Sequence, residues 1–337
     1  MLACHKVTPS LTLYFSDCRR DVSPQLLQLL AGAYAPGTVK NIRSAIRVYL
    51  AFMIKNQFPV FPPNIMHVAQ FYAHLLSRLT AMGSLANYQS AVNTFYKLYG
   101  VHLDTADIVF KLLNMSAKKH LTTAPVQKPP LEFAHLLQMI SIVNPQDPTE
   151  VAFINAIVIG FMATLRRSNI CPPSPTQYDE HKHLRREDVL MTQDGLVVVL
   201  RWTKTNQASQ HLFKIPIAFS GDDRFDPPRI FRLFNQRYPV KPADPCFSFY
   251  AENRLFVLTH SDLARMLNRF LSDIGVPADA YTTHSIRKGG TTAFHRAGVR
   301  SELLKAHGTW QSDAYQTYLG HSYADLLSVS QSVYKNL

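Results

Sequence analysis

The segment THSIRKGGTTAFHRAGV, residues 283–299, combines a His-x-x-Arg pattern with helical spacing. We expect a helix over about His284 to Ala297, with Gly298 at its C-terminal end. The i, i+3 spacing places His284 and Arg287 on one face near the helix N-terminus, where main-chain N–H groups favour a phosphate. A lone His-x-x-Arg is most often an ordinary surface pair, so other parts of the chain must decide what this one does.

Two candidate cations lie upstream of this segment. The almost wholly apolar stretch from Thr149 to Leu165 predicts a buried helix, and Arg166 follows it. Two extended runs, LVVVLRW (196–202) and HLFKIPI (211–217), predict a β-hairpin, and Lys204 begins its polar loop. Taken singly, Arg166 could pair with a buried acid and Lys204 could be an ordinary hairpin cation.

An aromatic pair lies downstream, in GTWQSDAYQTYL, residues 308–319. Trp310 and Tyr318 belong to it, and we expect a helix over about Asp313 to Leu319. A tyrosine on such a helix is usually a core or interface residue. Three further tyrosines compete with Tyr318 for any chemical role: Tyr315, Tyr323 and Tyr334.

In chain order, six of these positions resemble the signature of the tyrosine recombinase (phage-integrase) superfamily: Arg166, Lys204, His284, Arg287, Trp310 and Tyr318. The resemblance covers essentially all of residues 130–337. Within it, the segments 283–299 and 308–319 look most like recombinases encoded by eukaryotic DIRS- and Ngaro-type mobile elements. The resemblance implies a site-specific DNA recombinase or integrase that cuts and rejoins DNA through a 3′-phosphotyrosyl intermediate.

The resemblance also implies a role for each charged side chain, and the chemistry of the residue types agrees with it. Arg166 and Arg287 would neutralise the charge that develops on the non-bridging phosphate oxygens, because a guanidinium binds two oxygens at once and stays charged. Lys204 would protonate the leaving 5′ oxygen. His284 would serve the nucleophile as acid or base, or orient the phosphate.

The aromatic residues complete this implied site. Trp310 would donate its indole N–H and pack against the site. Tyr318 would be the nucleophile, since its distance from Trp310 matches the family pattern, whereas Tyr315 matches a position usually held by a packing aromatic residue. Three departures are visible: Asn169 stands where many prokaryotic members have Glu, Trp310 replaces a commoner His, and the spacing from Trp310 to Tyr318 is one residue shorter than in several bacterial and phage members.

The N-terminal third carries most of the positive charge. The whole chain has 35 Lys and Arg against 23 Asp and Glu, a formal net charge of +12. Residues 1–125 contain 12 basic and four acidic residues, which gives 12 − 4 = +8 and leaves +4 for the rest. Such a module is typical of proteins that lie on a polyanion, although a solvated basic surface would look the same.

Periodicity arranges part of this charge. After Pro36, with Thr38 as the expected N-cap, apolar residues recur at helical spacing on one face and cations on another. Further helices are expected over about 64–78 and 85–98, the second capped by Ser84. We expect DNA contacts from Lys40, Arg43, Arg47, Lys118 and Lys119.

The predicted fold is mainly α with a small β-hairpin or sheet: a helical core-binding domain and an integrase-like catalytic domain of the DNA breaking-rejoining type. We expect a basic helical domain over 1–120, in which 1–22 can be a flexible arm, a linker over 121–130, and the catalytic domain over 131–337. Further helices are expected over about 131–142, 261–274 and 301–307.

Composition excludes several classes. An apolar fraction of 47% with 17% charged residues argues against disorder. The longest apolar stretch, Val151 to Ala163, is shorter than the roughly 20 residues that span a bilayer, so we expect no membrane segment. Four widely spaced cysteines predict a reducing, intracellular compartment, and the resemblance implies a location with the DNA, which is the nucleus in a eukaryote. No phosphate-binding glycine loop is present, and we expect no cofactor.

Three other functions fit parts of the sequence. A catalytically idle, domesticated DNA-binding protein would have the same charge pattern, and a type IB topoisomerase-like enzyme would share the chemistry. A metal-dependent nuclease using His181 and His183 is weaker, because we expect these residues to be solvated in a charged loop. For the recombinase, double-stranded DNA is the expected partner and a homo-multimer, a tetramer on DNA, the expected assembly.

Overall fold

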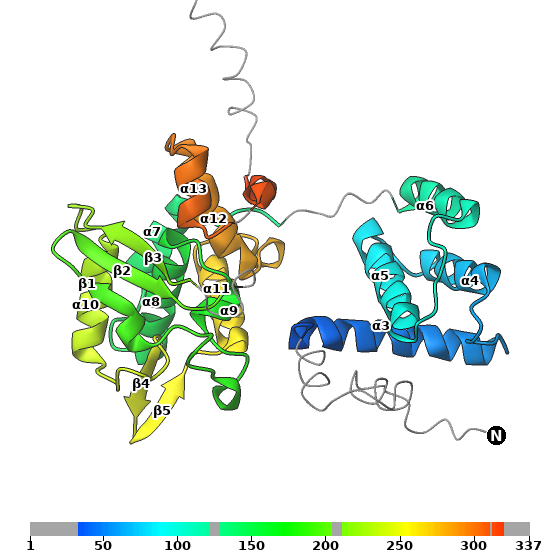
Figure 1. The fold of residues 1–337 in the computed structure, drawn as a ribbon. Coiled ribbons are helices and arrows are strands. Elements are labelled where there is room, and N and C mark those ends of the chain that lie inside the picture. The colour runs from blue at the N-terminus through cyan, green and yellow to red at the C-terminus, as the bar shows by residue number, and fades with distance from the viewer. Residues whose placement is uncertain (1–32, 122–127, 204–210, 311, 320–337) are drawn as a thin grey trace, which may run out of the picture. The chain divides into compact units, whose positions relative to one another are not determined.

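The chain forms two compact units, Met1–Gln127 and Lys128–Leu337. The computed structural model describes residues 33–121, 128–203, 211–310 and 312–319, with the main chain but not the side chains of Pro36 and Tyr318. The expected arm, 1–22, lies outside the described residues. The division between the units falls within 121–130. Figure 1 shows the first unit as a group of helices and the second as helices around small sheets.

The first unit is helical throughout its described secondary structure. Its helices are α3 (Pro36–Lys55), α4 (Ile65–Leu76), α5 (Met82–Leu98) and α6 (Ile108–His120). Buried aromatic side chains form its centre, where the Tyr49 and Tyr96 hydroxyls lie 2.5 Å apart and Tyr96 donates to the Val60 carbonyl at 3.0 Å. Burying both rings leaves the charged side chains outside.

Two of the predicted helix starts are wrong. Helix α3 begins at Pro36 with Ala35 as N-cap, so Thr38 lies inside its first turn. Proline suits this position because the first turn has no use for its missing N–H. Helix α5 is capped by Ala81 and not by Ser84. Helix α4 is capped by Asn64, whose side chain accepts from Met66 N at 2.8 Å.

The second unit mixes helices with two small antiparallel sheets (Figure 1). Its helices are α7 (Phe133–Ile142), α8 (Pro148–Met162), α9 (Arg167–Ile170), α10 (Pro227–Arg237), α11 (His260–Asp273), α12 (His284–Arg296) and α13 (Ser301–His307). Its strands are β1 (Val189–Met191), β2 (Gly195–Leu200), β3 (Phe213–Ala218), β4 (Ser248–Ala251) and β5 (Arg254–Val257). Short 3₁₀ segments include η2 (Arg186–Asp188) and η4 (Asp313–Tyr318).

The predicted hairpin is confirmed as β2 and β3, with Leu196 opposite Ile217. Strand β1 extends this sheet, and α10, β4 and β5 are further elements that periodicity did not predict. The expected helix at Asp313 to Leu319 is the 3₁₀ segment η4. Gly298 follows α12 with a φ of 78°, the left-handed conformation that glycine adopts most readily.

Helix α8 is the central element of the second unit. Its residues from Ala152 to Phe161 are all buried, and it contacts α7, α10, α11 and α12. Helix α12 approaches it closely, because a Cβ at Gly290 would overlap the carbonyl oxygen of Phe161. Two adjacent glycines therefore bring the His-x-x-Arg helix against the end of α8, which leads into Arg166.

Candidate active site

Helix α12 presents its first turn at the C-terminal end of α8. Gly289 lies against the carbonyl of Leu131, and the Leu131 N–H donates to the Ser285 carbonyl at 2.9 Å. The Lys288 Nζ donates to the Lys128 carbonyl at 3.1 Å. The segment that enters the second unit is thus fastened along the helix that carries His284 and Arg287.

Arg287 connects three segments that are distant in sequence. Its side chain is 2% exposed, and its Nη1 donates to the Thr164 carbonyl. Its Nη2 donates to the Gly308 carbonyl at 2.9 Å, and its guanidinium carbon lies 4.0 Å from the centre of the Trp310 ring. Arginine has five N–H donors, so a phosphate would use this guanidinium alongside two carbonyls that already orient it.

Arg166 lies two residues beyond that Thr164 carbonyl. It is the half-buried N-cap of α9, with Thr164 turned into the left-handed region at a φ of 48°. The Arg166 carbonyl accepts from Asn169 N at 2.8 Å. Such strain at a β-branched residue costs free energy, and the Arg287 bond to its carbonyl holds this turn in place.

His284 is the first residue of α12, with part of its ring exposed. Desolvation lowers the pKa of His284 below its usual value, and the positive charges of Arg287, Arg166 and Lys288 act in the same direction. The ring therefore favours its neutral form, which can accept a proton. Since both arginines act on His284 electrostatically, three of the predicted residues lie in one place.

Trp310 completes the described part of this cluster. It is 7% exposed and packs with Leu304 and Tyr315. The Trp310 and Tyr315 ring centres lie 6.0 Å apart. A Cβ at Gly308 would overlap the Trp310 ring, so only glycine fits there. Of the predicted residues, His284 and Arg287 thus lie on the first turn of α12, and Arg166 and Trp310 lie beside it.

Of the two remaining predicted residues, the structure describes only the main chain of Tyr318 and does not describe Lys204. Tyr318 is the last residue of η4, a segment that contacts α12, and its side chain lies outside the described residues. Tyr315 in the same segment is 5% exposed and buried against Trp310. Lys204 lies outside the described residues, and the described chain stops one residue before it.

Several side chains and carbonyls of this site could not be identified from the sequence. The carbonyls of Thr164 and Gly308, which accept from Arg287, leave no trace in composition or spacing. Asn169 donates through Nδ2 to the Trp202 carbonyl at 2.8 Å. It therefore ties α9, beside Arg166, to the end of β2. A glycine pair inside a predicted helix, Gly289 and Gly290, was the available signal of close packing.

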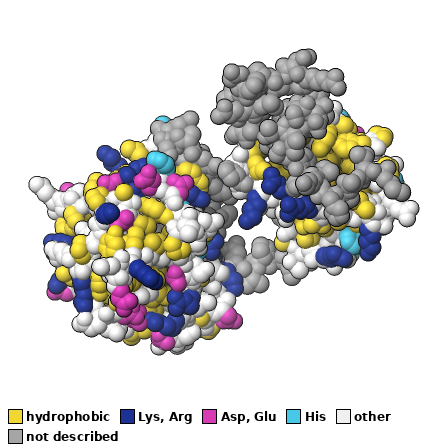
Figure 2. Space-filling model, turned by 90° about the horizontal axis from the view of Figure 1, so that it is seen from below, with side chains coloured by type: hydrophobic (Ala, Val, Ile, Leu, Met, Phe, Trp, Pro, Cys, Tyr) yellow, Lys and Arg dark blue, Asp and Glu magenta, His cyan; other side chains and the backbone are white. Residues whose placement is uncertain are grey.

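The expected DNA-binding cations lie at the surface of the first unit. Lys40, Arg43 and Arg47 are exposed on α3, on the side opposite Tyr49 and Met53. Lys118 and Lys119 are exposed in the last turn of α6. On the face in Figure 2, the coloured charges of the first unit are mostly basic, whereas basic and acidic side chains mix on the second.

The two histidines considered for a nuclease, His181 and His183, differ in their exposure to solvent. His181 is exposed, as expected, but His183 is buried and its Nδ1 lies 3.0 Å from the Asp179 main-chain nitrogen, so the expectation that both are solvated is wrong. The local turn from Asp179 folds the His183 ring inward. Within the described ranges, no group of three His, Cys, Asp or Glu side chains is arranged to hold a metal ion.

Among the described helices, none is both long and apolar enough to cross a bilayer.

Comparison with solved structures identifies the fold. The chain matches a XerH site-specific recombinase bound to a palindromic difH substrate with a TM-score of 0.63 and 12% identity, covering 96% of this chain and 89% of that one. It matches a Tn1549 transposon integrase in complex with transposon right end DNA with a TM-score of 0.58 and 17% identity, covering 96% and 99%. A lambda integrase dimer bound to a core site gives 0.51 and 12%, covering 87% and 92%.

Comparison of the sequence itself gives no match. No family model matches the chain, and no curated protein matches it. At identities of 12% to 17%, the TM-scores of 0.58 to 0.63 show a shared fold. The predicted fold class, mainly helical with small antiparallel sheets and with the fold that these recombinases and integrases share, is therefore confirmed.

Proposed function

We propose that this protein is a site-specific DNA recombinase that breaks and rejoins DNA through a covalent bond to Tyr318. The observation that carries the proposal is the setting of Arg287, which bonds to the carbonyls of Thr164 and Gly308 and stacks on Trp310. Together with Arg166 and His284, it concentrates positive charge and donors on one turn. Such a cluster suits the charge of a phosphodiester under attack.

The reaction is a transesterification. The Tyr318 phenol loses its proton, with His284 as the candidate acceptor, and its oxygen attacks phosphorus. A P–O bond to Tyr318 forms as the bond to the 5′ oxygen breaks, and Lys204 gives that oxygen a proton. The product is a 3′-phosphotyrosyl link and a 5′ hydroxyl. The covalent bond conserves the free energy for rejoining, so the cycle needs no cofactor.

The finer identity follows from sequence resemblance. The segments 283–299 and 308–319, with Trp310 in place of the commoner histidine, support an origin in a mobile element of the DIRS or Ngaro type. Double-stranded DNA is the proposed partner. Strand exchange needs several sites on paired duplexes, so a tetramer on DNA is the proposed working assembly, and in a eukaryote the nucleus is the proposed location.

A nicked DNA duplex tests the activity. When cleavage releases a short fragment that diffuses away, rejoining fails and the protein stays attached to DNA after denaturation. Target sites are unknown, so a pool of random duplexes is used and the trapped DNA is sequenced. We expect an adduct that forms in EDTA and carries a recurring sequence.

Tyr318→Phe and Tyr315→Phe form a matched pair, because each removes one hydroxyl. We expect Tyr318→Phe to bind DNA and form no adduct, and Tyr315→Phe to form one. An adduct lost only in Tyr315→Phe would overturn the assignment. Binding without any adduct would identify an idle DNA-binding protein. An adduct accompanied by relaxation of supercoils but no recombined product would indicate a topoisomerase.

A further inference from the structure

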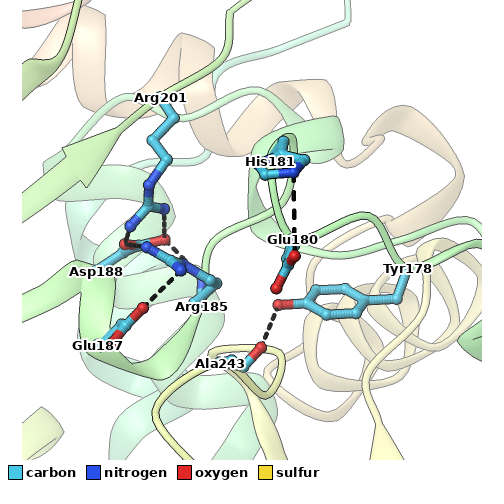
Figure 3. A network of polar contacts seen from close by, with 8 residues as sticks. All are labelled: Tyr178, Glu180, His181, Arg185, Glu187, Asp188, Arg201 and Ala243. Carbon is cyan, nitrogen blue, oxygen red and sulfur yellow. Dashed lines mark hydrogen bonds and ion pairs between the residues drawn. The ribbon is translucent and has the colours of Figure 1, made fainter. Parts of the chain in front are cut away.

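The residues that follow β2, just before Lys204, are held by a partly buried ion pair between Arg201 and Asp188. The Arg201 Nη1 donates to Oδ2 of Asp188, and its Nη2 donates to Oδ1 (Figure 3). This bidentate geometry fixes the orientation of the guanidinium as well as its distance from the carboxylate. Asp188 closes the 3₁₀ segment η2, so β2 is tied to the segment that leads into β1.

Asp188 is buried, and it makes further hydrogen bonds besides those from Arg201. It is 1% exposed, and it also accepts from Arg185 N at 2.9 Å, with Arg185 Nη2 at 3.5 Å. Arg185 in turn pairs with Glu187 at 2.6 Å. Desolvation raises the pKa of Asp188 to about 6, and the hydrogen bonds from Arg185 oppose that rise. Removing Arg201 would leave a buried carboxylate with one partner fewer.

A second contact holds the next residue of the same segment. The Trp202 carbonyl accepts from Asn169, three residues after Arg166. The chain just before Lys204 is therefore fixed to Asp188 by one residue and to the neighbourhood of Arg166 by the next. A buried ion pair adds little stability compared with apolar residues of similar size, so stability alone does not account for its place here.

We propose that Arg201 and Asp188 are positioning residues, which hold the base of the β2–β3 loop so that Lys204 reaches the leaving 5′ oxygen. This inference rests on the proposed function. The pair touches no reacting atom and acts through Lys204. Its loss should therefore slow only the step that needs the proton of Lys204.

A DNA substrate with sulfur in place of the bridging 5′ oxygen isolates that step. A thiolate is a far better leaving group than an alkoxide, so cleavage of this substrate does not need an acid. On ordinary DNA we expect Lys204→Ala to lose about 10²-fold or more in cleavage rate, and Arg201→Met about 10-fold to 100-fold. On the sulfur substrate both variants should cleave within about threefold of wild type.

Further variants guard against a loss of folding. Arg201→Lys keeps the charge but not the bidentate bond, so it should lie between wild type and Arg201→Met on ordinary DNA. Asp188→Asn should behave like Arg201→Met. The control is Arg224→Met, which breaks an exposed pair with Asp222 and should change neither rate.

The outcomes separate this inference from the proposed function. If wild type forms no adduct, or Lys204→Ala is not rescued by sulfur, the proposed chemistry fails. If Lys204→Ala is rescued but folded, DNA-binding Arg201→Met and Arg201→Lys remain slow on the sulfur substrate, the positioning role is wrong. Normal cleavage of ordinary DNA by both Arg201 variants would overturn it equally.

Discussion

The two units use their positive charge in opposite ways. Residues 33–121 contain nine Lys and Arg but only two acidic residues, Asp104 and Asp107, and both accept main-chain N–H groups at the start of α6. Within this described range, no Lys or Arg pairs with a carboxylate. In the second unit many do, as Arg185, Arg269 and Arg296 show.

This difference separates binding from chemistry. Unneutralised, exposed cations attract any polyanion and add little to folding stability. In the described part of the second unit, cations such as Arg185, Arg201 and Arg269 are paired with carboxylates, and Arg287 is oriented by two carbonyls, so these side chains have a fixed direction. Fixed direction is what stabilisation of a transition state requires. With the proposed function, this difference predicts that the first unit captures DNA and that the second cleaves it.

The largest expected effect is on cleavage, from Arg287→Lys in the second unit. An ammonium keeps the charge but cannot bond to the Thr164 and Gly308 carbonyls and bind a phosphate with the geometry of a guanidinium. We expect a loss of about 10³-fold in the rate of adduct formation, with DNA affinity within about threefold of wild type. Quantifying trapped adduct over time, beside affinity, checks both. Near-normal cleavage would make Arg287 a structural residue only.

A smaller effect, on affinity alone, is expected from the first unit. Replacing Lys40, Arg43 and Arg47 by alanine should weaken binding to all sequences alike and lower the salt slope by roughly 0.9 per lost phosphate contact, about 2 to 3 in all. Melting temperature should be unchanged. The matched control replaces three paired arginines of the second unit, Arg224, Arg229 and Arg265, and should leave most of the slope intact. Equal slopes in wild type and the Lys40, Arg43 and Arg47 variant would show that these residues do not contact DNA.

The smallest expected effect is a loss of folding stability of the second unit at acidic pH. Burial lowers the pKa of its histidines His183, His260, His284 and His307, that of His260 to about 4. The unfolded chain then binds protons more readily, so stability is present above about pH 6.5 and is lost as pH falls towards the depressed values. The raised pKa of Asp188, about 6, partly offsets this loss between pH 6 and 4.

We therefore expect the free energy of unfolding to fall by about 1 kcal/mol between pH 7 and pH 5.5. Urea denaturation at the two pH values measures it. His260→Gln should reduce the difference. A protein equally stable at both values would mean that these rings are not held neutral by the fold.

The sequence predicted the elements with strong periodicity and missed those that depend on distant partners. Helices α8 and α12 and the β2–β3 hairpin carry clear patterns, and their positions bring four predicted site residues together. The β4–β5 hairpin was missed because its turn, Glu252 and Asn253, reaches the left-handed region without glycine. Helix α10 was missed because it starts with two prolines, which usually indicate the absence of a helix although the first turn of a helix tolerates them.

Contacts between segments that are distant in the sequence could not be predicted from the sequence pattern. Nothing in the spacing of Arg201 and Asp188 indicates that they pair, and nothing in the sequence around Asn169 indicates its bond to the Trp202 carbonyl. Such pairs are set by the topology that joins the elements. They also explain how a site built from residues some 150 positions apart acquires one geometry.

The central claim is that a single tyrosine of the second unit bonds to DNA. Trypsin digestion of the trapped adduct, after nuclease trimming, should give one peptide carrying a nucleotide remnant, residues 306–335, which contains Tyr315, Tyr318, Tyr323 and Tyr334. Fragmentation in the mass spectrometer locates the remnant within it. The account predicts the remnant on Tyr318. A remnant on any other residue would contradict it.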